Sequence, residues 1–291
     1  MSSTATVAFV TYSGVPDLTV DDRLAVDALA MLDVRTDALC WDDPSVEWQR
    51  YEAIVLRSTW DYYLRLAEFV AWVDRLESVN ARLWNPPRMV RGNLDKRYLT
   101  ELRHPHLAPP PSAFFVRGAR IDLAALLEAR GWTEAVIKPT VSADGFSTER
   151  TSRATAFDDQ SLVEAMVERS DIVIQRLVPD IRTNGELSLM FFGGRFSHAV
   201  NKRPTHEEFR VQERLGGTIA PAIAPARLVR HATDLVATSA ADSLYARIDV
   251  VIAEGRFVLM ELELVEPSLF LAHSPAAPAA FADAVRRVAT T

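Results

Sequence analysis

Residues 245–264 read YARIDVVIAEGRFVLMELEL, a pattern of two strands on either side of a Glu-Gly turn. Side chains alternate between the faces of a strand, so Arg247 and Asp249 share one face, as do Glu261 and Glu263. If the two strands pair, three carboxylates and one guanidinium converge, an arrangement that is costly without a counter-charge. Because Mg²⁺ prefers oxygen ligands, the pattern predicts a metal site.

A solvated sheet face that binds nothing is the other interpretation of these acidic residues. Against it, the positions that alternate with the glutamates are apolar: Met260, Leu262 and Leu264. The second strand therefore has an inner and an outer side, and the metal site is the stronger prediction.

Lysine is rare in this chain. Of 32 basic residues only three are lysines, Lys96, Lys138 and Lys202, and the others are arginines. Lysine supplies a compact ammonium where arginine supplies a planar fork, so these lysines are candidates for positions that require an ammonium. Chance placement is the alternative, but each lysine lies in a separate segment with features of a binding site.

Lys138 ends an apolar strand and precedes a loop of small and hydroxyl residues, Thr140–Ser147. The stem of such a lysine is buried while its ammonium needs water or an anion, and such a loop can contact phosphates. The loop does not have the Walker A pattern. Taken alone, the segment slightly favours a snorkelling lysine before a hairpin. The segment Gln175–Val178, before Pro179, has backbone groups that could bind the edge of an adenine. Taken alone, this segment is more typical of a strand end.

Composition excludes several classes of protein. The chain has 291 residues, 48% hydrophobic and 24% charged, which is typical of a globular protein with two or three lobes. A net charge of −7 argues against nucleic-acid binding. The apolar runs are far shorter than the roughly 20 residues that cross a membrane, and no signal peptide is recognised, so we expect a cytoplasmic protein without a membrane partner.

Cysteine and histidine predict no metal centre. Cys40 is the single cysteine, so we expect neither a disulfide framework nor a thiolate cluster. The six histidines show no metal-binding pattern in the sequence. We expect His104 and His106, on either side of Pro105, to face solvent.

The chain reads as three units. The first alternates strands and helices, which predicts a parallel sheet with covering helices; it lacks a GxGxxG motif, so a dinucleotide site has little support. A smaller unit follows, and then strands separated by hairpin turns. We expect an α/β fold that becomes α+β in its C-terminal part, with lobes at residues 1–92, 93–170 and 171–291. We also expect a helix over residues 94–102.

The order of these motifs resembles that of the ATP-grasp superfamily over essentially the whole chain. Residues 261–267, ELELVEP, resemble the end of bacterial glutathione synthetases. A narrower resemblance is to glutathione-synthetase-like enzymes of secondary metabolism, such as the O-ureido-serine cyclo-ligases of cycloserine formation; it rests on residues 57–63 (RSTWDYY), 201–204 (NKRP) and 266–270 (EPSLF).

The resemblance implies an ATP-grasp fold with an N-terminal parallel-sheet lobe, a small central lobe and a C-terminal antiparallel-sheet lobe. It further implies a ligase that uses ATP and magnesium to join a carboxylate of an amino-acid-like substrate to a nitrogen nucleophile through an acyl phosphate, releasing ADP and phosphate. Homodimers are common among relatives, so a homodimer is one expectation for the assembly.

The resemblance also assigns roles to residues. ATP would be bound by Lys96, Lys138, Ser142, Gly145, Ser147, Gln175, Arg176, Leu177, Val178 and Glu186. Two Mg²⁺ ions, with Mn²⁺ as an alternative, would be bound by Asp249, Glu261 and Glu263. The transferred phosphoryl group and the oxyanion would be stabilised by Arg247, with Lys202 and Arg203 near the γ-phosphate or the substrate. Two departures stand out: Glu263 replaces an asparagine of glutathione synthetases, and the loop over the phosphates has a single glycine.

Substrate contacts are expected from the N-terminal lobe. Arg57 follows the strand at residues 53–56, at the edge where open α/β sheets bind ligands, and could hold a carboxylate with two hydrogen bonds. Trp60, Asp61 and Tyr62 could shape the pocket, although a buried tryptophan and an Arg57–Asp61 ion pair fit the sequence equally well. The other candidates are Tyr12, Ser13, Ser58, Arg210 and Ser268.

Three rival functions share part of this pattern. An ATP-grasp phosphotransferase would use the same ATP residues and release a stable phosphorylated product. A non-catalytic nucleotide-binding module would not need three carboxylates. A Rossmann-type oxidoreductase is the weakest alternative, because the glycine motif is absent.

Overall fold

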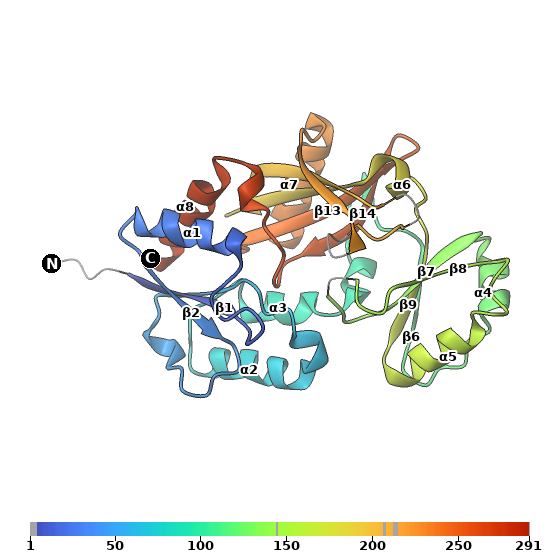
Figure 1. The fold of residues 1–291 in the computed structure, drawn as a ribbon, viewed down its shortest axis with the longest axis horizontal. Coiled ribbons are helices and arrows are strands. Elements are labelled where there is room, and N and C mark those ends of the chain that lie inside the picture. Colours follow the sequence, from blue (N-terminus) through green and yellow to red (C-terminus); the bar gives the residue numbers. More distant parts are fainter. Residues whose placement is uncertain (1–4, 144, 206–207, 212–214, 291) are drawn as a thin grey trace.

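The computed structural model describes residues 5–143, 145–205, 208–211 and 215–290. Asp144, in the loop expected to cover the phosphates, lies outside this part of the chain. Three sheets organise the molecule, and Figure 1 shows the first at the lower left, the second at the right and the third across the top.

The N-terminal sheet is parallel, with strand order β2-β1-β3-β4. Its strands are β1 (Thr6–Thr11), β2 (Arg35–Cys40), β3 (Ala53–Leu56) and β4 (Leu83–Trp84). Its helices are α1 (Val20–Ala30), α2 (Leu66–Ser78) and α3 (Pro87–Asn93). Thr19 caps α1 by accepting the Asp22 N–H at 3.0 Å. The expected parallel sheet is confirmed.

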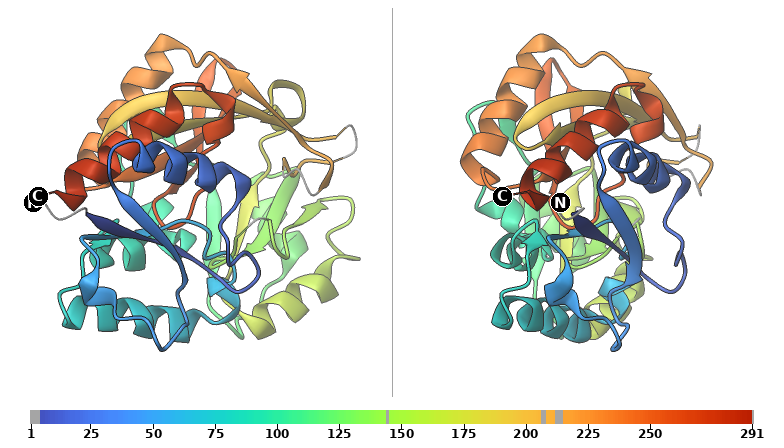
Figure 2. Two further views of the ribbon diagram at one scale, coloured as in Figure 1. Left: turned by 60° about the vertical axis from the view of Figure 1, so that its left-hand side comes forward. Right: turned by 90° about the vertical axis from the view of Figure 1, so that its left-hand side faces the viewer.

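The two faces of this sheet are covered from different parts of the chain. Alternate residues of β1 separate: Val7 and Phe9 join a core with α1 and α8 (Ala277–Ala289), whereas Ala8 and Val10 pack with α2. The C-terminal helix thus completes the N-terminal lobe, and Figure 2 shows the end of α8 beside the start of β1.

The central sheet is antiparallel, with order β6-β9-β7-β8. Its strands are β6 (Ser112–Phe115), β7 (Glu134–Pro139), β8 (Glu149–Ser152) and β9 (Ile172–Arg176), and its helices are α4 (Leu123–Arg130) and α5 (Gln160–Arg169). The lobe expected at residues 171–291 would include β9. It pairs here instead because Ile172 and Ile174 share one core with α4 and α5.

The C-terminal sheet has six strands in the order β12-β11-β10-β13-β14-β5, and only β14 and β5 pair in parallel. The strands are β5 (Leu107–Ala108), β10 (Glu186–Phe192), β11 (Arg195–Arg203), β12 (Thr218–Ala222), β13 (Tyr245–Ala253) and β14 (Arg256–Glu263). The short helix α6 (Ile181–Asn184) precedes β10, and α7 (Ala226–Ser239) covers one face with Leu228 and Leu235. Both expected hairpins, β10–β11 and β13–β14, are confirmed.

The prediction of a helix over residues 94–102 is wrong. The segment is instead the 3₁₀-helix η3 (Lys96–Thr100), because Asp95 caps it at the Arg97 N–H and the Lys96 N–H is drawn to the Thr140 carbonyl at 2.8 Å. The other 3₁₀-helices are η1 (Trp48–Arg50), η2 (Tyr62–Leu64) and η5 (Leu271–His273). Within the described residues, every helix is too short or too polar to cross a membrane.

Candidate active site

The hairpin of β13 and β14 brings the predicted acidic residues together. In the observed register Arg247 lies opposite Glu263 and Asp249 lies opposite Glu261. One carboxylate oxygen from each of Asp249, Glu261 and Glu263 lies within 4.8 Å of the others. Hard oxygen donors of this kind suit a divalent cation of the Mg²⁺ type, which would draw them closer together.

Asp249 is held in place by hydrogen bonds on every side. Its Oδ1 accepts from the Ser188 hydroxyl at 2.6 Å, and the Arg247 guanidinium donates to both oxygens at 3.0–3.3 Å. The Lys202 ammonium lies 3.1 Å from Oδ2. Burial alone would raise the pKa of Asp249, but Arg247 and Lys202 hold it well below its usual range. These two cations therefore favour the ionised form of the carboxylate.

The pKa values of the two glutamates of the hairpin are shifted in opposite directions. Burial opposes ionisation of Glu261, but the ammonium groups of Lys96 and Lys138, at 3.9 and 3.7 Å, lower its pKa to about 2. Burial raises the pKa of Glu263 well above its usual value, against the lowering effect of its ion pair with Arg247, and the charges of Glu261 and Asp249 add to the rise. A cation that bound all three carboxylates would favour the ionised form of Glu263 and so oppose this rise.

All three lysines of the chain reach this region from separate elements. Lys96 begins η3 and donates to the Ser142 carbonyl at 2.8 Å. Burial lowers the pKa of Lys138, because the buried ammonium has lost water. An anion beside the ammonium would offset that cost. Burial also acts on Lys202, but Asp249 and Glu186 raise its pKa, and Glu186 lies 2.6 Å away. The cations and carboxylates thus balance one another across a small volume.

A cavity of about 580 Å³ lies between the three sheets, with these charges on its wall. The site residues expected from the sequence that line it are Tyr12, Trp60, Tyr62, Lys96, Lys138, Ser142, Gly145, Gln175, Arg176, Leu177, Val178, Glu186, Lys202, Arg210, Arg247, Asp249, Glu261, Glu263 and Ser268. They come from every lobe, so the cavity exists only in the folded arrangement of all three.

The segment Gln175–Val178 has one backbone donor to spare. The Arg176 N–H donates to the Pro111 carbonyl at 2.9 Å and the Leu177 N–H to the Glu134 carbonyl at 3.1 Å. Among the described residues, none accepts the N–H of Val178. The Gln175 amide is already bonded to the Ser112 hydroxyl at 3.0 Å. Val178 is therefore the backbone donor in this segment that a ligand can use.

The loop after β7 contacts both neighbouring lobes. The Phe146 ring lies 5.0 Å from that of Tyr63, and Arg210 donates to the Thr148 carbonyl at 3.3 Å. These contacts hold the loop over the cavity. Ser147 takes no part in lining it; its side chain is exposed and its backbone is left-handed, with φ of 48°.

The structure does not place Arg57 in the cavity. Its side chain is 1% exposed, its Nε donates to Asp22 at 2.9 Å, and its Nη2 donates to the Pro267 carbonyl at 3.0 Å. The guanidinium also faces the rings of Tyr245 and Phe281. Arg57 joins the N-terminal sheet to the C-terminal lobe, because its guanidinium donates to the Leu56 carbonyl at the end of β3 and to the Pro267 carbonyl of the C-terminal lobe.

Four other residues expected at the site also lie outside the cavity lining. Ser58 is buried against Thr11, and Asp61 accepts from Trp41 and Arg65. Ser13 and Arg203 are exposed. Arg203 follows Lys202 in β11, and alternation turns its side chain away from the site.

The cavity also has residues to which the sequence assigned no role. Glu266 and Phe270 line it directly. Burial raises the pKa of Glu266 to about 7, against the opposing charges of Lys96 and Arg247. Glu266 lies in the resembling segment EPSLF and could have been proposed on that basis.

Two further lining residues position the hairpin of β13 and β14. Asn93 bonds the Leu262 carbonyl and the Leu264 N–H, and the Tyr98 hydroxyl accepts the Leu262 N–H at 2.9 Å. Both contacts join segments far apart in the chain, and no local sequence pattern reveals them.

Comparisons with known proteins agree with this geometry. A family described as D-cycloserine synthetase DcsG, N-terminal domain, matches residues 7–85. The cycloserine biosynthesis protein DcsG of Streptomyces lavendulae is 31% identical over 281 residues, covering 89% of this chain and 91% of that protein. This chain belongs to the DcsG family. As a member of that family it is an ATP-dependent ligase.

Solved structures place this DcsG-family chain among the ATP-grasp ligases. The crystal structure of D-cycloserine synthetase DcsG superposes with a TM-score of 0.84 at 29% identity, covering 98% of this chain and all of that one. The ATP-grasp ligase PsnB, solved with a minimal precursor, gives 0.68 at 15% identity over 98% and 99% of the two chains. D-alanine–D-alanine ligase of Bacillus anthracis gives 0.67 at 13% over 98% and 97%. The expected ATP-grasp fold is confirmed.

Proposed function

We propose that this ligase activates the carboxylate of an amino-acid-like substrate as an acyl phosphate and joins it to a nitrogen nucleophile. One observation carries the proposal: three ammonium groups and Arg247 face three carboxylates across a single cavity. Phosphoryl transfer needs this kind of positioning and charge neutralisation rather than a protein nucleophile.

ATP would lie in the cavity with its adenine beside Val178 and its phosphates beside Lys96 and Lys138. The Val178 N–H would donate to the adenine edge, between the apolar side chains of Val136 and Met260. The phosphates would then extend toward Lys96 and Lys138, whose ammonium groups lie near Glu261. Ser142 and Gly145, in the loop above the cavity, would cover them.

Two Mg²⁺ ions would be held by Asp249, Glu261 and Glu263, and Mn²⁺ would suit the same oxygen donors. When bound, these ions neutralise phosphate charge and polarise the phosphoryl oxygens. Lys202 and Arg247 now occupy the oxygens of Asp249. They would turn toward the negative charge of the substrates, which keeps them close to the transferred group.

The reaction would have two steps. A substrate carboxylate oxygen attacks the γ-phosphorus, the bond to the bridging oxygen breaks, and ADP leaves. The nitrogen nucleophile then attacks the acyl carbon, and phosphate leaves as the oxyanion collapses. Arg247 would stabilise that oxyanion, and Glu266, with its pKa near 7, would accept the nitrogen's proton.

The family relationship supports an amino-acid-derived substrate. The matching relatives are named for D-cycloserine synthesis. An O-ureido-serine whose own nitrogen closes the ring is therefore the first substrate to test. Tyr12, Trp60 and Tyr62 from the N-terminal lobe, with Arg210 and Ser268 from the C-terminal lobe, would surround it.

Release of ADP tests the proposal. The chain with ATP and Mg²⁺ is assayed against O-ureido-serine, single amino acids and dipeptides, with and without hydroxylamine. An acyl phosphate gives a hydroxamate, which supports the ligase reaction. A stable phosphorylated product and no hydroxamate would instead show the rival phosphotransferase.

A further inference from the structure

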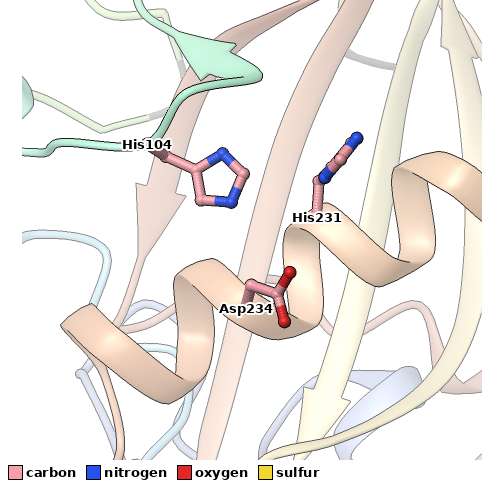
Figure 3. A group of neighbouring side chains, drawn as sticks. All are labelled: His104, His231 and Asp234. Atoms are coloured by element: carbon pink, nitrogen blue, oxygen red, sulfur yellow. The ribbon is translucent and has the colours of Figure 1, made fainter.

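A second group of ligand-type side chains lies away from the catalytic cavity. His104, His231 and Asp234 each place one donor atom within 4.8 Å of the others, and Figure 3 shows them facing one another between the loop and α7. The ring centroid of His106 lies 4.3 Å from that of His231. None of these residues lines the catalytic cavity. The sequence expectation that the histidines form no such group is wrong, since the fold joins residues from distant segments.

Helix α7 determines the direction of two members. His231 and Asp234 are three residues apart, so they lie on the same side of the helix. Leu228 and Leu235, which are buried against the C-terminal sheet, lie on the adjoining side of the helix, so His231 and Asp234 stand at the border of the buried side. The ring contacts of His231 with His104 and His106 show that this border faces residues 104–106, which run past the helix to β5.

The surroundings of His104 and His231 favour the neutral form of both imidazoles. Burial lowers the pKa of His104, and His106 adds to the effect while Asp234 opposes it. Burial likewise lowers the pKa of His231, helped by His106, His104 and Arg227 and opposed by Asp234. A neutral imidazole has the free lone pair that a metal ion requires.

We propose that His104, His231 and Asp234 form a binding site for a divalent transition metal ion, with Zn²⁺ as the best-fitting member of that class. Imidazole nitrogens with one carboxylate are ligands that Zn²⁺, Ni²⁺ and Cu²⁺ prefer, whereas Mg²⁺ prefers all-oxygen sites. His106, exposed beside His231, is placed to supply the fourth ligand.

Metal binding requires a small closure of the loop. Zn–N distances of about 2.0 Å place tetrahedral donors roughly 3.3 Å apart, closer than the present separation. His104 Nδ1 accepts the His106 N–H at 3.2 Å, so the proton of this ring is on Nε2. Binding through Nε2 moves that proton to Nδ1 and opens the bond. The ion then ties the loop to α7 in its place.

The site would act as a clamp on the C-terminal sheet. Residues 104–106 lead into β5, which pairs with β14, the strand that bears Glu261 and Glu263. A bound ion stabilises the folded state because the unfolded chain does not have the site preformed. The melting temperature should rise with Zn²⁺ without any nucleotide.

Calorimetric titration of the full chain with Zn²⁺ tests the site, in excess Mg²⁺ to occupy the catalytic carboxylates. We expect one Zn²⁺ per chain for the wild type and for Asp249→Asn. His231→Gln and His104→Gln should each weaken binding at least about tenfold. His273→Gln, a histidine outside the group, should bind as the wild type does. Thermal melts without metal show that each variant is folded.

Imidazole NMR supplies a readout that does not depend on affinity. Zn²⁺ should shift the side-chain resonances of His104 and His231, and Mg²⁺ should leave them unchanged. Equal Zn²⁺ binding by the wild type and both histidine variants would overturn the proposal. So would loss of binding in Asp249→Asn, which would place the ion in the catalytic cavity.

Discussion

The ammonium of Lys202 lies 3.1 Å from Oδ2 of Asp249, and 2.6 Å from Glu186 on its other side. A residue expected near the γ-phosphate thus neutralises a carboxylate expected to bind metal. Because a buried charge is costly when unpaired, Lys202 offsets the cost of burying both carboxylates. We expect metal ions to replace Lys202 and Arg247 as the partners of the carboxylates. The two side chains would then bind the phosphates.

Removal of the Asp249 charge should stop catalysis. For Asp249→Asn we expect ADP release to fall at least about 100-fold, since the lost interaction is worth several kcal/mol and each 1.36 kcal/mol is tenfold. The variant is assayed over a range of Mg²⁺ concentrations. Asp283→Asn, which alters a surface ion pair, is the matched control. Turnover within twofold of the wild type would rule out the metal assignment.

Lys138 should contribute to ATP binding through its charge. For Lys138→Met we expect the KM for ATP to rise about tenfold or more, because a partly desolvated ion pair with phosphate is lost. Lys138→Arg should restore little, since a planar fork does not replace a compact ammonium there. Initial rates against ATP concentration measure both. Arg150→Gln, from an exposed ion pair, should leave the KM unchanged, and an unchanged KM in Lys138→Met would contradict the assignment.

Arg57 should matter for stability rather than for substrate binding. Asp22→Asn leaves the guanidinium buried without its counter-charge, so we expect the free energy of unfolding to fall by about 3 kcal/mol. Urea denaturation measures the loss, and Arg50→Gln, from an exposed pair with Asp37, should change it little. If Asp22→Asn instead raised the KM for the amino-acid substrate and left the stability unchanged, Arg57 would be a substrate-binding residue.

Glu266 should make stability depend on pH. Its pKa rises from 4.5 to about 7 on folding, chiefly by burial. Below pH 4.5 both states are protonated and there is no penalty; between pH 4.5 and about 7 only the unfolded state ionises, so stability falls as the pH rises. Glu266→Gln should therefore melt higher than the wild type at pH 8 and equally at pH 4. Glu101→Gln is the exposed control, and an equal difference at both pH values would exclude the shift.

Local patterns in the sequence predicted the elements that carry the chemistry. Strand alternation placed Asp249, Glu261 and Glu263 on one side of the hairpin, and the register confirms it. The rarity of lysine marked Lys96, Lys138 and Lys202, and all three line the cavity. These predictions succeed because side-chain direction within a strand, and the choice of ammonium over guanidinium, are properties of a few neighbouring residues.

Contacts between distant segments followed from no such pattern. Burial made Arg57 part of a lobe junction, β9 joined the central sheet, and α8 returned to cover the N-terminal one. His104 and His231 likewise meet only where a loop passes over α7. Local sequence dictates which groups a segment presents and on which side. Which distant groups meet them is decided by the packing of whole elements, because burial of their apolar faces contributes far more free energy than any single polar contact.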